Sequence, residues 1–345
     1  MQFHIDRDEK SVISGWLTPD NPSMVPSFII ACHGQPEIQF SATVLRPEIK
    51  QQGHHSSGLV GFHVDETIVP NLGGLADLQI FEAETRTLIH RRFQGLNRKL
   101  FVFDFCTLPD TLVHQILPAH FSLCYGRVER YPFDSLYSIL NNQSANSILA
   151  AGRPSLLRYQ EVLNTNGYLV TALVRSPYEA LAERLRLIFE LASSHSLSAT
   201  DEDSSELAGL IDIAKATQSN NPVRLEATFD ALTENQANVI SNPVVRALAC
   251  GIGDAPTNRH VAVALNNLAT MDLVGIYARF DEFKTVLSEI LAHEVLAGFE
   301  PPDTGGPTPL AAQLSSIRSV RKMLALDLAL YNYVEEAIRT ATPNL

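Results

Sequence analysis

The chain has 345 residues, which is too many for one typical hydrophobic core, so its length predicts two domains. Apolar residues make up 45% and charged residues 19%, a composition typical of soluble globular proteins. The net charge of −12 opposes binding to nucleic acid and to anionic membranes, so neither class of partner is favoured.

Two further features bear on the compartment. Four cysteines lie far apart among apolar neighbours, which favours small buried thiols in a reducing environment: Cys32, Cys106, Cys124 and Cys250. Residues 1–10 lack the apolar run of a signal peptide, and no stretch of eighteen apolar residues occurs. These patterns predict a cytoplasmic protein with no transmembrane segment.

Residues 1–97 have the pattern of a small antiparallel β-sandwich. Clusters of Gly, Pro, Asn and Ser separate short segments rich in β-forming residues. Five or six strands at this spacing suit a sandwich. The expected strands lie at 11–18, 27–34, 38–45, 58–65, 75–84 and 87–93.

Residues 98–345 predict a second domain of the α/β class. Short continuous apolar runs are typical of strands buried on both faces, as in a parallel sheet. These runs lie at 99–105, 120–126, 167–174 and 272–278. Helical periodicity at 178–192, 204–218, 281–296 and 319–340 alternates with them.

One arginine lies where a predicted strand meets a predicted helix, in "GYLVTALVRSPYEALAERL" (167–185). A helix N-terminus presents free N–H groups and a positive dipole end, and an arginine adds a fork that matches phosphate oxygens. Arg175 is therefore a candidate anion ligand, and Ser176 can add a hydroxyl. The alternative is a surface arginine at a strand end.

This segment resembles the strand, turn and helix that bind the 3′-phosphate of the donor nucleotide in sulfotransferases. Three further pieces follow in the order found in bacterial carbohydrate sulfotransferases: "NPVVRALACG" (242–251), "ALNNLATMDLVGIYARFDEF" (264–283) and "LDLALYNYVEEAI" (326–338). The resemblance implies a P-loop sulfotransferase-like fold for residues 98–345. It also implies 3′-phosphoadenosine 5′-phosphosulfate as the donor if the protein is active, with Arg175 and Ser176 as its ligands.

The front segment, "SGWLTPDNPSMVPSFIIACHGQ" with the later "VLRPEIKQQG" and "GLVGFHVD", is similar to a small β-sandwich found beside bacterial glycosyltransferases. That resemblance implies a role in glycan or polysaccharide metabolism and a carbohydrate acceptor as partner.

The chain departs from the sulfotransferase pattern at the donor site. The family carries a lysine in a Gly-rich loop after the first strand, where it stabilises the transferring group. None of the six lysines lies in such a turn, and the expected place reads "GRVERYPFDS" (126–135), with a helix start expected to be capped by Asp134 or Ser135. Arg127 and Arg130 could form a substitute anion clamp, or they could be solvated loop residues.

A second departure lies beyond Arg175, where Glu183 occupies the position of a usual serine, and a third is Ala278 in place of a glutamate. A carboxylate near a phosphate is repulsive, so Glu183 weakens the predicted anion site.

His120 precedes the predicted strand at 121–125 and is the candidate general base for an acceptor hydroxyl; the alternative is a packed, hydrogen-bonded histidine. No spacing of His and Cys predicts a metal site.

Three functions follow from these patterns. The first is a diverged carbohydrate sulfotransferase with an altered donor loop. The second is a non-catalytic relative that binds a glycan or a partner on the same fold. The third is another group transferase that uses a different anionic donor. The missing lysine and Gly-rich loop favour the second function on mechanistic grounds.

Overall fold

The computed structural model describes residues 1–32, 34–93, 95–105, 117–193, 202–218, 221–299 and 308–341. The chain divides into two compact units. The first consists of Met1–Val102, Asp110–Gly152 and Tyr159–Val170, and the second of Phe103–Pro109, Arg153–Arg158 and Thr171–Leu345. We expect residues 1–97 and 98–345 to fold independently of each other, and this boundary stays a prediction.

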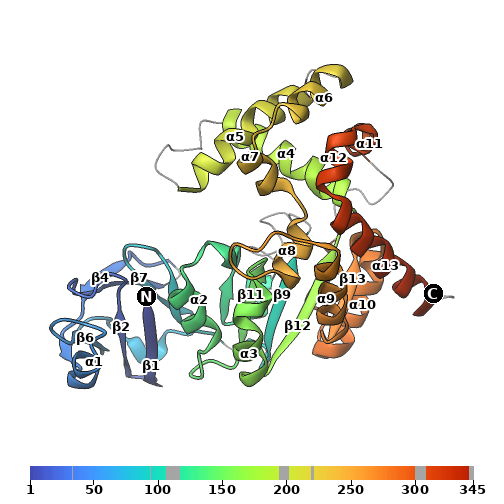
Figure 1. Ribbon diagram of the computed structural model, residues 1–345. Coiled ribbons are helices and arrows are strands. Elements are labelled where there is room, and N and C mark those ends of the chain that lie inside the picture. Colours follow the sequence, from blue (N-terminus) through green and yellow to red (C-terminus); the bar gives the residue numbers. More distant parts are fainter. Residues whose placement is uncertain are drawn as a thin grey trace. The chain divides into compact units, whose positions relative to one another are not determined.

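The N-terminal part of the first unit contains two four-stranded antiparallel sheets, drawn in blue and cyan in Figure 1. One sheet has the order β1-β2-β6-β5 and the other β4-β3-β7-β8. The expectation of an all-β N-terminal region is confirmed, with eight strands rather than five or six. Their bounds are β1 Gln2–Glu9, β2 Val12–Thr18, β3 Ser27–Cys32, β4 Ile38–Ser41, β5 Val44–Leu45, β6 Leu59–Val64, β7 Leu78–Glu82 and β8 Leu88–Arg92.

Apolar side chains from both sheets form the core between them. Alternate residues of β2 are buried, as expected for a strand with one face on a core. The ring of Phe28 on β3 lies 4.7 Å, centroid to centroid, from the ring of Phe62 on β6. Because these strands belong to different sheets, the contact shows that the sheets pack face to face as a sandwich.

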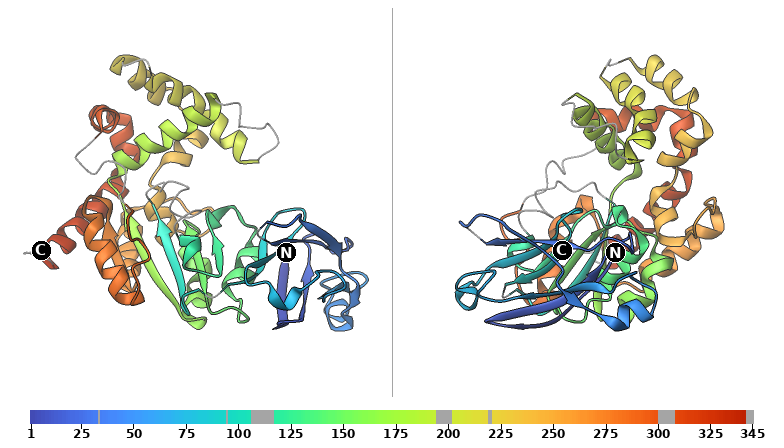
Figure 2. Two further views of the ribbon diagram at one scale, coloured as in Figure 1. Left: turned by 180° about the vertical axis from the view of Figure 1, so that it is seen from behind. Right: turned by 90° about the vertical axis from the view of Figure 1, so that its left-hand side faces the viewer.

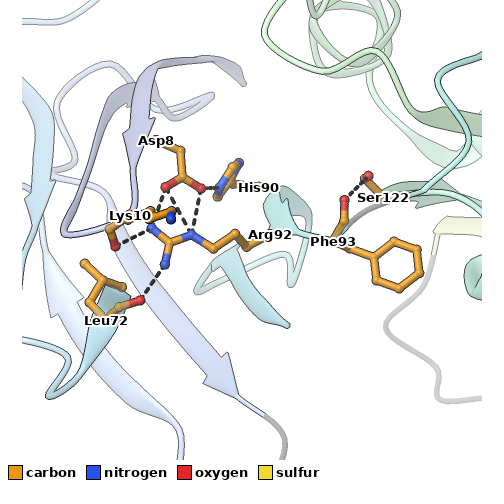
Figure 3. A network of polar contacts seen from close by, with 7 residues as sticks. All are labelled: Asp8, Lys10, Leu72, His90, Arg92, Phe93 and Ser122. Atoms are coloured by element: carbon orange, nitrogen blue, oxygen red, sulfur yellow. Dashed lines mark hydrogen bonds and ion pairs between the residues drawn. The ribbon is translucent and has the colours of Figure 1, made fainter. Parts of the chain in front are cut away.

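A polar network also links the two sheets (Figure 3). The carboxylate of Asp8 on β1 accepts hydrogen bonds from Arg92 Nε (3.0 Å) and interacts with His90 Nε2 (2.9 Å), both on β8. Arg92 also donates to the carbonyl oxygens of Leu72 and Lys10. Burial by itself raises the pKa of Asp8, but the hydrogen bonds from His90 and Arg92 outweigh it and lower the pKa to about 2.

The α/β region contains one five-stranded parallel sheet with the order β10-β11-β9-β12-β13. At the start of β11 and β9, the Ile148 N–H donates to the Arg98 carbonyl. At the end of β9 and β12, the Phe105 N–H donates to the Leu173 carbonyl. The strands are β9 Lys99–Asp104, β10 Leu123–Tyr125, β11 Ile148–Gly152, β12 Tyr168–Val174 and β13 Leu273–Ile276.

The segments 167–174 and 272–278 are confirmed as strands of one parallel sheet, where β12 and β13 pair directly from Thr171↔Leu273 to Val174↔Ile276. Strand β11, "ILAAG", was not expected from the sequence, because two alanines and a glycine carry little β-propensity.

The strand order places a switch point between β9 and β12. The chain leaves β9 towards β10 and β11 on one side, then crosses to β12 and β13 on the other. Ligands of open α/β sheets bind beyond the carboxyl ends of the strands at such a point. Phe105 and Arg175 directly follow these two ends, and both belong to the second unit.

The helices of the chain are α1 Pro47–Gln51, α2 Phe133–Leu140, α3 Leu156–Thr165, α4 Pro177–Ser193, α5 Glu202–Thr217, α6 Pro222–Asp230, α7 Glu234–Ile240, α8 Pro243–Ala249, α9 Asn258–Ala269, α10 Phe280–Leu291, α11 Pro309–Ser316, α12 Arg318–Met323 and α13 Ala325–Ala341. Short 3₁₀ turns occur at η1 Leu72–Gly74, η3 Leu117–Ala119, η4 Val128–Arg130 and η5 Tyr277–Arg279. Within the described ranges, no helix is both long and apolar enough to cross a membrane.

Six helices of the second unit share one hydrophobic core, and Figure 2 shows two further views of them. Leu185 of α4, Ile213 of α5 and Leu314 of α11 are fully buried there, together with side chains from α6, α7 and α12. One helix was expected at 319–340, but the structure has two, with a break at Leu324. The break frees the N–H groups at the start of α13 for a side-chain cap.

Candidate functional site

The candidate site begins at the turn between β12 and α4. Strand β12 is almost entirely buried, and α4 starts at Pro177, whose fixed φ and missing N–H suit the first helical position. Ser176 is half-buried, and its carbonyl accepts the N–H of Ala180. Arg175 lies directly before it and is only 6% exposed. The structure therefore places Arg175 at the carboxyl end of a parallel strand, but inside the protein rather than on its surface.

Two glutamates of α4 form ion pairs with the Arg175 guanidinium. Its Nη1 lies 2.7 Å from Glu183 Oε1, and its Nη2 lies 3.5 Å from Glu179 Oε2. The guanidinium carbon also lies 4.0 Å from the centroid of the buried Tyr277 ring. Two carboxylates and an aromatic face thus compensate the charge of one arginine.

The two carboxylates differ in their surroundings. Glu179 Oε1 accepts the N–H of Thr308, the N-cap residue of α11, at 2.8 Å. Burial raises the pKa of Glu183, and the positive charges of Arg175 and Arg186 only partly offset this. The Oε2 atoms of both glutamates accept no hydrogen bond from any described residue. Two carboxylates of α4 therefore lie against the Arg175 guanidinium, which leaves less of its charge available to a phosphate.

A small cavity lies beside Arg175 in the second unit. Its volume is about 30 Å³, enough for roughly two water molecules. Three guanidinium groups and one carboxylate line it, together with apolar side chains. The lining residues are Phe105, Arg153, Arg175, Pro177, Ala180, Leu181, Arg184, Ile240, Pro243, Val244, Leu324 and Asp327.

Asp327, in the wall of this cavity, joins two of the segments that resemble sulfotransferase motifs. Its carboxylate accepts the N–H groups of Val244 (3.0 Å) and Val245 (2.8 Å) at the start of α8. In return, Asn242 Oδ1 accepts the N–H groups of Leu326 (2.9 Å) and Asp327 (3.1 Å) at the start of α13. The two helix starts therefore cap each other, and the asparagine and the aspartate have structural roles.

Burial raises the pKa of Asp327 to about 7, although the two backbone hydrogen bonds and the charge of Arg246 act in the opposite direction. The carboxyl group is completely buried, so its ionised form has lost its hydration and relies on these N–H groups.

The motif around β13 also has a structural role. Arg279 forms an ion pair with Glu282 at 2.5 Å, and its Nη1 donates to the carbonyl of Ile338 at 3.4 Å. Tyr277 of the same motif stacks on Arg175. This segment thus links α10 and α13 through Arg279, and its Tyr277 packs against Arg175.

The turn after β10 differs from the turn after β12. Arg127 is half-buried with a left-handed backbone (φ 51°), and Arg130 is exposed at the end of η4. Both residues have interaction partners in the protein. The expectation that Asp134 or Ser135 caps the next helix was wrong: Pro132 is the N-cap of α2, and it makes no side-chain cap.

His120 lies at the other end of β10. It is half-buried before the first residue of the strand, whereas Arg127 follows the last. Its carbonyl accepts the Leu96 N–H at 2.8 Å, and its N–H donates to the Leu117 carbonyl at 3.0 Å. The structure thus separates His120 from Arg127 and Arg130 by the length of a strand, and its role as a base stays a prediction.

Arg175 and Ser176 belong to the second unit, whereas Arg127, Arg130 and His120 belong to the first.

Of the residues around Arg175, the sequence pointed to Glu183 but not to Glu179 or Tyr277. The spacing of four residues between Arg175 and Glu179 was a usable signal, because such residues are neighbours on a helix face. Nothing in the local sequence points from Arg175 to Tyr277, which is about a hundred residues away.

Comparison with protein-family models, with curated proteins and with solved structures finds no match for this chain. Among the described residues, no group of three or more His, Cys, Asp or Glu side chains is arranged to hold a metal ion.

Proposed function

We propose that this chain is a sulfotransferase-like protein of glycan metabolism that binds carbohydrate without transferring sulfuryl groups. The observation that carries the proposal is the engagement of buried Arg175 by Glu183 and Glu179. A nucleotide phosphate at Arg175 would have to displace both carboxylates. Taking one partner from a buried ion pair typically costs about 3–5 kcal/mol, which would consume much of the affinity of a phosphate contact.

The lost lysine supports the same conclusion. Sulfuryl transfer needs positive charge on the bridging oxygen, and removing such a group typically lowers the rate about 10²–10³-fold. The segment 126–135 carries two arginines, but Glu129 and Asp134 offset their charge. The alternative is an active carbohydrate sulfotransferase, or another group transferase, with 3′-phosphoadenosine 5′-phosphosulfate or a different anionic donor in an altered site.

Calorimetry with adenosine 3′,5′-bisphosphate separates these functions. We expect the native chain to give no binding up to about 1 mM nucleotide, because Glu183 covers the guanidinium. Glu183→Ser should open the site and give measurable binding. Glu190→Ser is the matched control, because Glu190 is an exposed glutamate on the same helix.

A micromolar dissociation constant for the native chain would contradict the non-catalytic proposal and favour a transferase. The carbohydrate part of the proposal is tested separately, by retardation of the native chain in gels that contain soluble polysaccharides.

A further inference from the structure

Helix α2 of the first unit exposes two aromatic rings side by side. Phe133 is 41% exposed and Tyr137 43% exposed, and their ring centroids are 5.9 Å apart. Phe133 also lies 5.7 Å from the ring of Tyr159, which is buried. The cluster is therefore anchored in the protein on one side and exposed on the other. Single exposed apolar residues are ordinary, but a contiguous aromatic pair is characteristic of a binding surface.

Polar side chains flank these rings on the same helix face. At 100° per residue, Phe133, Tyr137, Asn141 and Asp134 fall within an arc of about 100°. All four are exposed, whereas Leu136, Ile139 and Leu140 of the same helix are buried. Asn141, the C-cap residue, is oriented by a hydrogen bond from Asn166 Nδ2 at 3.2 Å. The face thus combines two flat apolar rings with a carboxylate and an amide.

The charges around this face cancel. Residues 126–141 contain two basic side chains, Arg127 and Arg130, and two acidic ones, Glu129 and Asp134. A surface without excess charge does not attract a polyanion or a strongly charged peptide. It suits an uncharged ligand that offers an apolar surface to the rings and hydroxyl groups to the polar side chains.

We propose that Phe133 and Tyr137 form a platform for an uncharged β-linked pyranose chain. This inference rests on the proposed carbohydrate-binding function and locates its site. A β-linked glucose unit carries its C–H bonds on the ring faces and its hydroxyls at the rim. Its faces therefore stack on Phe133 and Tyr137, while its rim reaches Asp134 and Asn141. The spacing of the two rings is similar to one sugar unit, so consecutive units contact consecutive rings.

Affinity electrophoresis tests the platform with three probes: hydroxyethylcellulose, dextran as an α-linked polymer, and heparin as a charged one. We expect hydroxyethylcellulose to retard the native chain most. The double variant Phe133→Ala/Tyr137→Ala should lose at least about tenfold in affinity, because each stacked ring contributes several-fold. Tyr333→Ala is the matched control, because Tyr333 is 62% exposed on α13, outside the platform, and its removal should change nothing.

Three further measurements decide the result. Tyr137→Phe keeps the ring and should retain binding. Circular dichroism should show the double variant folded, because both side chains are exposed on one side. Sedimentation should show the same mass for the native chain and the double variant; a native dimer that the variant breaks would overturn the proposal in favour of an interface between two copies.

The outcomes separate the platform from the proposed function. If hydroxyethylcellulose retards the native chain and the double variant equally, the chain binds carbohydrate elsewhere and the platform is wrong. If dextran or heparin is preferred, the β-linked, uncharged ligand is wrong. If no polysaccharide retards the native chain, the carbohydrate-binding function itself fails.

Discussion

Two turns of this protein each carry arginine after a buried parallel strand, and the structure gives the arginines opposite environments. Arg175 after β12 is buried, paired with two glutamates and stacked on Tyr277. Arg130, near the end of β10, is exposed on a short 3₁₀ turn. Topology therefore decides where such an arginine lies, but the side chains of the following helix decide whether its charge is available to a ligand.

The helix that follows a strand can itself close an anion site at the turn between them. A helix that starts after a strand brings residues four and eight positions onwards back over its first turn. When these residues are glutamates, their carboxylates take the place that an anion would occupy. On α2, the helix that follows the turn at 126–135, Asp134 and Tyr137 are exposed.

The largest effect is expected from removing the buried arginine. Arg175→Ala leaves two carboxylates, Glu179 and Glu183, buried without their cation, so we expect a loss of about 5 kcal/mol in the free energy of unfolding, the upper end of the range for a broken buried ion pair. Arg130→Ala should change it by no more than about 0.5 kcal/mol, because the residue is exposed. Urea denaturation measures both. Equal effects of the two substitutions would contradict the contrast between the turns.

The second prediction concerns Asp327, which lines the same cavity as Arg175 but is held by backbone N–H groups instead of a guanidinium. Its pKa in the folded state, about 7, lies above the ordinary value of 3.8. The folded state therefore holds the proton more tightly, and the associated stability is present below about pH 4 and lost as the pH rises towards 7. The shift of about three units corresponds to a loss on the order of 4 kcal/mol.

Asp327→Asn cannot ionise, so it serves as the reference. We expect the free energy of unfolding of the native chain, relative to Asp327→Asn, to fall between pH 4 and pH 8 in urea titrations. A difference that is independent of pH would show that the two N–H groups keep Asp327 ionised throughout.

The smallest effect is expected in the sandwich, where Arg92 pairs with Asp8 across two sheets in a partly exposed position. The pKa of Asp8, about 2, lies below the ordinary 3.8, so its stabilisation is present above about pH 4 and lost as the pH falls through 2. Solvent screening limits it to about 1 kcal/mol. Between pH 5 and pH 2, the midpoint of thermal unfolding should fall less with pH in Asp8→Asn than in the native chain. An equal fall in both would show that Asp8 does not contribute to the acid dependence.

The sequence by itself determined the classes of the two regions and the position of Arg175. Period-2 segments with turn clusters indicated the antiparallel N-terminal region, and continuous apolar runs indicated the parallel sheet, because both patterns record which faces of a strand are buried. The resemblance to sulfotransferases also pointed to Glu183 as an obstacle to an anion, because it occupies the position of a usual serine.

Other features were decided only by the tertiary structure. The strand β11, the break at Leu324, the mutual capping of Asn242 and Asp327, and the aromatic wall from Tyr277 all depend on residues distant in sequence. Asn242 and Asp327 are 85 positions apart, and Arg92 and Asp8 are 84 apart. Local propensity carries no information about such pairs, because burial and hydrogen bonding between remote segments arise only when the sheets and helices pack.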